Sequence, residues 1–211
     1  MGAPSKKQLK SARSMLKPAS RRSVLAPSPY PERKVQNTNF SSLISNAGAS
    51  QLFNGLQLGT DYNNRVGRQV TNVSIYQRIT AQANASAGQN TYIRFLLFWI
   101  KEPQATAPTL TSVFGTATPG INEMLNLNNR TDYVVLKDIT IPIGIVTGSG
   151  SCRFYKVYKK CNVRTVYNAS NLGTIADIES GALYMLAYSD TAVAANLPTL
   201  TIQSRVRFCD N

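Results

Sequence analysis

Residues 199–208 read TLTIQSRVRF, and two kinds of side chain alternate along this stretch. Successive side chains of a β-strand point to opposite faces, so a period of two indicates a strand with one packed face and one face in contact with water. The stretch therefore predicts a sheet that is buried on one side only. The apolar face carries Leu200, Ile202, Val206 and Phe208 together with Ser204, and the other face carries Thr201, Gln203, Arg205 and Arg207.

Short apolar runs separated by Asn, Ser, Thr, Ala and Gly make up the rest of the chain from about residue 36. Such runs, with polar turns and no sustained helical period, are typical of an all-β domain. Residues 92–100 and 134–145 are apolar almost throughout, as expected of central strands covered on both sides. We predict eight strands in a double-sheet sandwich, over residues 50–57, 69–84, 90–101, 132–143, 152–161, 163–168, 181–189 and 199–209.

Two segments between the third and fourth of these strands have helical features. Residues 109–114 follow Pro108, and residues 121–127 follow a Thr-Pro-Gly turn and have apolar residues at helical spacing. Both are predicted as short helices. An irregular loop describes the first segment nearly as well.

The first 34 residues hold most of the excess charge. They carry nine basic residues and one acidic residue, a net +8 of the chain's +13. A run of like charges repels itself and stays disordered until a polyanion neutralises it, so its natural partner is nucleic acid; a solvated tail or a nuclear localisation signal is the alternative. We divide the chain into a basic arm, residues 1–35, and a folded domain, residues 36–211. The expected nucleic-acid contacts are Lys6, Lys7, Lys10, Arg13, Lys17, Arg21, Arg22, Arg33 and Lys34.

Part of the arm has helical spacing. Ser5 and Gln8 match a capping box, and Pro18 ends the segment. We expect a short helix over residues 6–17, marginal in isolation, that orders when its basic stripe meets phosphates.

The composition argues against an enzyme. Histidine is absent, and the ten carboxylates form no Asp-x-Asp or Glu-x-x-Glu cluster of the kind that acid–base or metal chemistry needs. No apolar run approaches the length of a membrane span, about 18 residues, and the N-terminus lacks the apolar core of a secretory signal. We therefore expect a non-enzymatic protein that is made in the cytosol and has no membrane partner.

The three cysteines fit a reducing compartment. Cys152 and Cys161 lie in a stretch that reads as one strand, roughly 30 Å apart and on opposite faces, which is too far to bridge. Cys209 stands alone near the C-terminus. We expect three buried or half-buried thiols and no disulfide.

Four blocks of sequence behind the arm carry a resemblance to known proteins. They are NNRVGRQV at residues 63–70, IRFLLFW at 93–99, Leu125-Asn126, and YVVLKD at 133–138. In order and spacing they resemble blocks in the coat proteins of satellite tobacco necrosis virus and of related small circular single-stranded DNA viruses. The resemblance covers about residues 50–210.

The resemblance implies an eight-stranded antiparallel jelly roll that assembles with itself into a small icosahedral T=1 shell of about 60 copies. The arm would point inward and package a single-stranded genome, either RNA or DNA. Arg65 and Asp138 would be structural and bond loops at subunit contacts. The protein would reside in the virion after synthesis in the host cytosol, with passage through the nucleus if the arm acts as a nuclear signal, and the host receptor is unknown.

Calcium sites between subunits are implied less clearly. The satellite virus coats have adjacent acidic residues after the glycine that corresponds to Gly59, whereas this chain has Thr60-Asp61. Calcium prefers several charged oxygens, so metal binding stays open, with Asp61 and Asp210 as the candidates. No other cofactor is expected.

A second basic stretch, CRFYKVYKKCNVR at residues 152–164, adds to the arm. It either lines the shell interior and contacts the genome or faces an acidic host surface, and a solvated sheet face is the third interpretation. Two other functions stay open: a cellular nucleic-acid-binding protein with a basic tail, and a jelly-roll carbohydrate-binding module. The additional basic contacts expected here are Arg153, Lys156, Lys159, Lys160 and Arg164.

Overall fold

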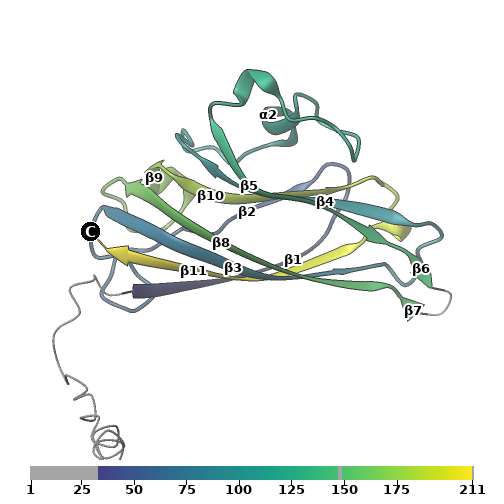
Figure 1. The fold of residues 1–211 in the computed structure, drawn as a ribbon, viewed down its shortest axis with the longest axis horizontal. Coiled ribbons are helices and arrows are strands. Elements are labelled where there is room, and N and C mark those ends of the chain that lie inside the picture. Colours follow the sequence, from purple (N-terminus) through teal and green to yellow (C-terminus); the bar gives the residue numbers. More distant parts are fainter. Residues whose placement is uncertain (1–32, 147–148, 211) are drawn as a thin grey trace, which may run out of the picture. The chain divides into compact units, whose positions relative to one another are not determined.

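The computed structural model describes residues 33–146 and 149–210. The helix expected over residues 6–17 and the basic residues of the arm before Arg33 lie outside the described residues. The described chain forms two antiparallel sheets packed face to face, with one short helix, α2 (Leu110–Phe114), on the outer side of one sheet (Figure 1). No helix among the described residues is long and apolar enough to cross a membrane.

The five-stranded sheet contains the longest strands of the domain. Its order is β1–β11–β3–β8–β9, and every neighbouring pair is antiparallel. The edge strand β1 pairs with β11 along its whole length, from Arg33 opposite Cys209 to Leu43 opposite Thr199. The bounds are β1 (Arg33–Leu43), β3 (Gln69–Gln82), β8 (Cys152–Tyr167), β9 (Ile178–Ser180) and β11 (Thr199–Asp210).

The four-stranded sheet has the order β2–β10–β4–β5. Numbered one to eight along the chain without β6, β7 and β9, the main strands form sheets in the orders 1–8–3–6 and 2–7–4–5, which is the jelly-roll arrangement. The predicted all-β antiparallel jelly-roll sandwich is therefore confirmed. The remaining bounds are β2 (Ala49–Leu52), β4 (Thr91–Ile100), β5 (Tyr133–Ile143), β6 (Ile145–Val146), β7 (Ser149–Gly150), β10 (Ala182–Ser189) and the 3-10 turns Leu127–Asn129, Ile175–Asp177 and Ala194–Asn196.

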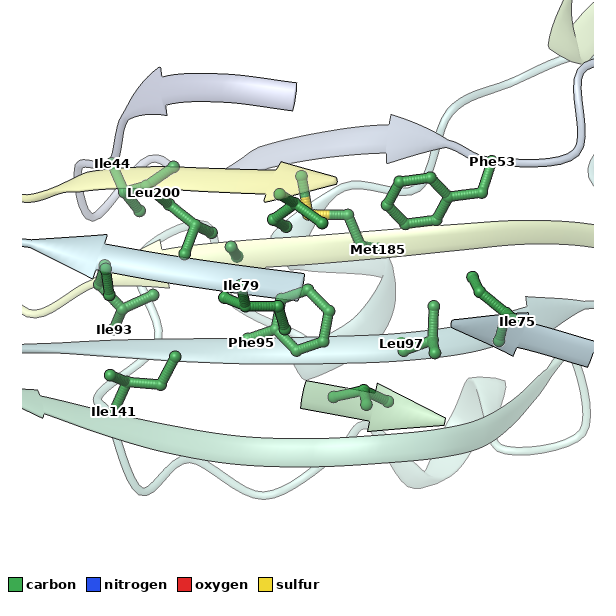
Figure 2. Close-up of a cluster of buried hydrophobic side chains, with 14 of the residues drawn as sticks. Ile44, Phe53, Ile75, Ile79, Ile93, Phe95, Leu97, Ile141, Met185 and Leu200 are labelled. Atoms are coloured by element: carbon green, nitrogen blue, oxygen red, sulfur yellow. The ribbon is translucent and has the colours of Figure 1, made fainter. Parts of the chain in front are cut away.

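Apolar side chains of both sheets meet between them and form the main core. In Figure 2, Ile75 and Ile79 of β3 lie opposite Phe95 and Leu97 of β4, and all four are almost fully buried. The other face of β4 packs under α2 in a second apolar cluster. β4 is buried on both faces, as predicted from its sequence, which is apolar almost throughout apart from Thr91 and Arg94.

The same prediction is wrong for the segment that contains β5. This strand is at the edge of its sheet, and Val134 and Val135 are 46% and 38% exposed. Some apolar side chains of this segment, which suggested a central strand, are therefore exposed on the surface of the domain.

Three of the eight main strands differ from the prediction, and one of them is β2, which ends at Leu52 although the strand was expected to reach residue 57. β1 was not expected because its sequence, RKVQNTNFSSL, is mostly polar; its backbone pairing with β11 holds it as an edge strand. The folded domain accordingly starts before residue 36. The strands expected over residues 152–161 and 163–168 are one strand, β8, which continues through an irregularity at Asn162 (φ 51°) where the register with β3 shifts.

α2 confirms the first predicted helix. It begins after Thr109, whose hydroxyl accepts a hydrogen bond from the backbone of Ser112, and it ends at Gly115 with a φ of 85°. The turn Leu127–Asn129 lies in the same connection between β4 and β5.

The helix predicted over residues 121–127 does not form. Arg94 of β4 donates hydrogen bonds to the carbonyl oxygens of Ile121 and Glu123. A helix would need these carbonyls for its own bonds to amides four residues later, so the side chain from the sheet replaces the helical pattern.

The three cysteines form no disulfide, as expected. Cys152 and Cys161 both lie on β8, but Cys152 is exposed rather than buried, whereas Cys161 is half-buried and Cys209 is buried. Burial raises the pKa of the Cys161 thiol.

Candidate nucleic-acid interface

The outer face of the five-stranded sheet is built by alternation along β3, β8 and β11. On β3, Ile75 and Ile79 enter the core, while Tyr76 and Arg78 point to the other side. The strand registers decide which outward side chains become neighbours. Four rows cross the sheet, namely Thr201–Thr80–Phe154, Gln203–Arg78–Lys156, Arg205–Tyr76–Tyr158 and Arg207–Ser74–Lys160.

The two sheets differ strongly in charge. β1, β3, β8 and β11 contain ten Lys or Arg residues and a single acidic residue, Asp210. The strands of the other sheet contain only Arg94, Lys137 and Asp138 as charged residues. We use the name basic face for the outward side chains of the first sheet, which are Arg78, Lys156, Lys160, Arg205 and Arg207 with Tyr76, Phe154 and Tyr158.

Within the described ranges, no residue of the basic face takes part in an ion pair. The ion pairs there are Lys34–Asp210, Arg68–Glu179 and Arg94–Asp138. Arg205 does donate a hydrogen bond, from Nε to Asn37 Oδ1 at 2.9 Å, but its acceptor is neutral. The face therefore keeps its positive charge and attracts polyanions.

Two adjoining hollows open on the basic face. One has a volume of about 400 Å³ and is lined by Phe154, Lys156 and Thr201 among others; the second, of about 380 Å³, includes Tyr76 and Arg205. Arg78 and Gln203 line both. Phe154 is 76% exposed and Tyr158 54% exposed, so planar rings stand beside cationic groups on an open surface.

The second basic stretch divides between the two sides of β8. Lys156, Lys160 and Arg164 alternate with the buried Val157 and Thr165 and share the outward side, where Arg164 donates to the side chain of Gln69. Arg153 and Lys159 fall on the opposite parity and so do not belong to the basic face. Two of the five predicted residues, Lys156 and Lys160, therefore belong to the basic face, and Arg164 lies on the same side of β8.

Lys34 is a structural residue rather than a free nucleic-acid contact. Its side chain is buried, with Nζ 2.9 Å from Asp210 Oδ2 and donating to the carbonyl of Asn64 at 3.0 Å. The ammonium therefore ties the start of β1 to the end of β11 and to a loop. Arg33, by contrast, is exposed, and the remaining predicted arm residues lie outside the described part of the chain.

The sequence did not predict that residues of β3 and β11 belong to this candidate interface. Their alternation showed that Arg78, Arg205 and Arg207 face water, but a single strand does not reveal its neighbours. Only the pairing of β3 with both β8 and β11 joins these residues to Lys156 and Lys160.

Arg65 and Asp138 are structural within the subunit. Arg65 is 1% exposed and donates to the carbonyls of Leu56, Gly67 and Ser170. Asp138 accepts both bonds of the Arg94 guanidinium fork, at 3.0 and 2.7 Å. Their expected roles at subunit contacts stay predictions.

The candidate calcium ligands lie in different settings. Asp61 is on an exposed loop, whereas Asp210 is paired with Lys34. Among the described residues, no three of Cys, Asp and Glu gather where they could hold a metal ion.

Solved structures with a similar trace come from virus particles. The structure of Desmodium yellow mottle tymovirus matches with 13% identity and a TM-score of 0.37, over 90% of this chain and 95% of that chain. Turnip yellow mosaic virus matches with 12% identity and a TM-score of 0.34, over 89% and 85%. A comparison with curated protein sequences gave no match.

The family comparison is more decisive. A model described as the geminivirus coat protein/nuclear export factor BR1 family matches residues 2–211, almost the whole chain. This match supports a viral coat protein in general and does not confirm the specific resemblance to satellite tobacco necrosis virus. The protein is a structural, non-enzymatic component of a virion, and the chain belongs to the geminivirus coat protein/nuclear export factor BR1 family.

Proposed function

We propose that the protein assembles into a T=1 icosahedral shell of about 60 copies and packages a single-stranded genome through its basic arm and its basic face. The arm would carry the larger charge and would also act as a nuclear localisation signal before assembly. Neither a cellular protein with a basic tail nor a carbohydrate-binding module accounts for the coat-protein family match.

The observation that carries this proposal is the charge difference between the sheets. Phosphate groups bind Lys and Arg by releasing counterions, a contribution that is independent of sequence. The basic residues of the basic face, Arg78, Lys156, Lys160, Arg205 and Arg207, provide such a surface on a sheet that follows the arm in the chain. The exposed Phe154 and Tyr158 add stacking platforms, which suit unpaired bases and are worth about 1–3 kcal/mol per base.

A salt titration of binding to single-stranded DNA and RNA oligonucleotides tests the basic face. The variant Arg78→Ala/Lys156→Ala should lower the slope of log K against log salt by about 1.4, because each lost single-strand phosphate contact removes about 0.7. A matched control, Lys101→Ala/Lys137→Ala, removes the same net charge elsewhere and should leave the slope closer to that of the parent. Equal slopes for both double variants would exclude the basic face from genome binding.

Stacking is tested separately with Phe154→Ala/Tyr158→Ala. This variant should bind more weakly without a change of salt slope, since no charge is lost. Affinity equal to that of the parent would remove stacking from the proposal. Comparing DNA with RNA in the same titrations shows which nucleic acid is preferred.

A further inference from the structure

One end of the domain carries two loops that are locked together. Loop 57–66 and loop 168–174 are joined by hydrogen bonds from Leu58 N to the carbonyl of Asn171 and from Arg65 to the carbonyl of Ser170. The Arg65 guanidinium also lies 4.5 Å from the centroid of the Tyr167 ring. The buried Arg65 therefore holds the two loops in a fixed arrangement.

The tips of these loops are apolar and exposed. Tyr62 is 69% exposed and Leu172 is 64% exposed, although nothing in the domain packs over them. Asp61 is the exposed charged residue of loop 57–66, because the other one, Arg65, is buried. We name this surface the loop cluster; its residues are Leu58, Asp61, Tyr62, Val66 and Leu172.

A complementary hollow lies on the outer side of the four-stranded sheet. It has a volume of about 180 Å³, with the buried Leu96 and Phe98 of β4 as its floor and Leu125, Leu127 and Val135 on its wall. We name it the apolar groove.

The groove is firmly built and has one charge. Asn126 N donates to the carbonyl of Val113 at 2.8 Å, and Asn129 Nδ2 donates to the carbonyl of Ser112 at 2.9 Å, so the wall is tied to α2. Arg130 is the only charged residue that lines the groove.

We propose that the loop cluster of one subunit docks into the apolar groove of the next copy, with Asp61 facing the neighbouring subunit's Arg130. Members of a coat-protein family assemble with themselves, and exposed apolar groups of this kind mark interaction surfaces. Opposite charges on the two surfaces favour a contact between different patches. A self-symmetric contact would instead bring Asp61 against Asp61 or Arg130 against Arg130.

Contacts between different patches form rings when the rotation between neighbouring copies closes, as it does around the fivefold and threefold axes of an icosahedral shell. The contact also leaves the basic face available to the genome, because it uses the four-stranded sheet and one end of the domain. The inference rests on self-association but not on the T=1 size or on genome binding. Particle diameter and nucleic-acid content therefore test the proposed function independently.

Charge exchange tests the pairing in the full chain. Asp61→Arg and Arg130→Asp should each reduce the fraction of protein in particles at least tenfold, measured by sedimentation velocity and negative-stain microscopy. The double variant Asp61→Arg/Arg130→Asp should restore assembly. A control with the same net charge, Asp61→Arg/Lys160→Asp, should not. Circular dichroism shows whether each subunit is folded, and a folded double variant that fails to assemble while the singles also fail would overturn the pairing.

Crosslinking gives a second readout that needs no charge change. On a Cys152→Ser background, Tyr62→Cys/Leu127→Cys particles should give oligomer ladders on non-reducing gels after mild oxidation. Neither Tyr62→Cys nor Leu127→Cys alone should do so. Dimers from Tyr62→Cys alone would show a self-symmetric contact and contradict the proposal, as would particles of the double variant that form no crosslink.

Discussion

Arg65 shows how one residue organises a region that has no regular secondary structure. Its guanidinium fork reaches three carbonyl oxygens that come from different parts of the chain. Lysine offers a single ammonium group in place of the planar fork, so it cannot reproduce this set. The Arg65 side chain therefore joins the two loops at the end of the domain, together with the backbone bond from Leu58 N to the carbonyl of Asn171.

We predict that Arg65→Lys lowers the free energy of unfolding by about 2–4 kcal/mol, because buried carbonyls lose charged donors. Urea unfolding measures this. Arg68→Lys is the matched control, since Arg68 pairs with Glu179 on the surface and should change stability by less than about 1 kcal/mol. If both variants unfolded at the same urea concentration, Arg65 would not be holding the loops.

The sequence patterns were a good guide to which residues are buried. They were a poor guide to which residues form hydrogen bonds or ion pairs with one another. Trp99 was predicted in an apolar run and Leu200 on the apolar face of an alternating strand, and both lie in the core. The partners of Arg65 and Arg94 could not be predicted, because backbone carbonyls carry no sequence signal and those of Ser170 and Ile121 are far away in the chain. The same limit hid the ion pair of Lys34.

At the scale of elements, strands were predicted correctly where burial of one face makes apolar and polar residues alternate in the sequence. They were missed where only backbone pairing with a neighbouring strand stabilises them. β11 and β3 alternate and were found with nearly correct bounds. β1 is polar, and β9 has three residues, so neither shows a pattern. The basic face depends on strand order, which a strand's own sequence does not contain.

The loop that precedes β9 contains a carboxylate that should respond to acid. Asp177 accepts hydrogen bonds from the backbone and hydroxyl of Thr174, at 2.6 and 3.1 Å. Burial alone would raise the pKa of Asp177, but hydrogen bonds from Ser170, Thr174 and Gly173 outweigh it and hold the pKa below its ordinary value. The carboxylate form therefore stabilises the folded loop.

A lowered folded-state pKa contributes stability above the unfolded pKa, about 4, and this contribution is lost as the pH falls through the folded value. We predict that amide exchange in residues 168–177 increases below pH 4 before the core strands respond. Asp177→Asn should produce the same local loosening at pH 7, measured by hydrogen exchange with mass spectrometry. Asp190→Asn is a control on another loop. Unchanged exchange in residues 168–177 for Asp177→Asn would contradict the prediction.

At the scale of the whole molecule, charge is separated between sheets and between the arm and the domain. The four-stranded sheet, with few charged residues, carries the apolar groove, whereas the five-stranded sheet carries the basic face and begins with β1, directly after the arm in the chain. Contacts with other subunits and contacts with a polyanion can then use different surfaces, so the two kinds of contact do not compete. The family match supports a viral coat protein.

The arm supplies the largest charge and gives the last prediction. In the proposed shell, about 60 arms with a net +8 each would bring about 480 positive charges, enough for a similar number of phosphates. Deleting residues 1–25 removes seven of these charges per subunit and no residue of the described strands. We expect a folded protein that forms empty shells or none, with a lower ratio of absorbance at 260 to 280 nm in purified particles.

A full-length control separates charge from length. Replacing the seven basic residues of that segment by Gln keeps the arm but should lose nucleic acid as the deletion does, because phosphate contacts depend on charge and carry no sequence information. Packaging should also weaken with rising salt in the parent. A deletion variant that packages as much nucleic acid as the full chain would remove the arm from the mechanism and leave the basic face as the genome contact.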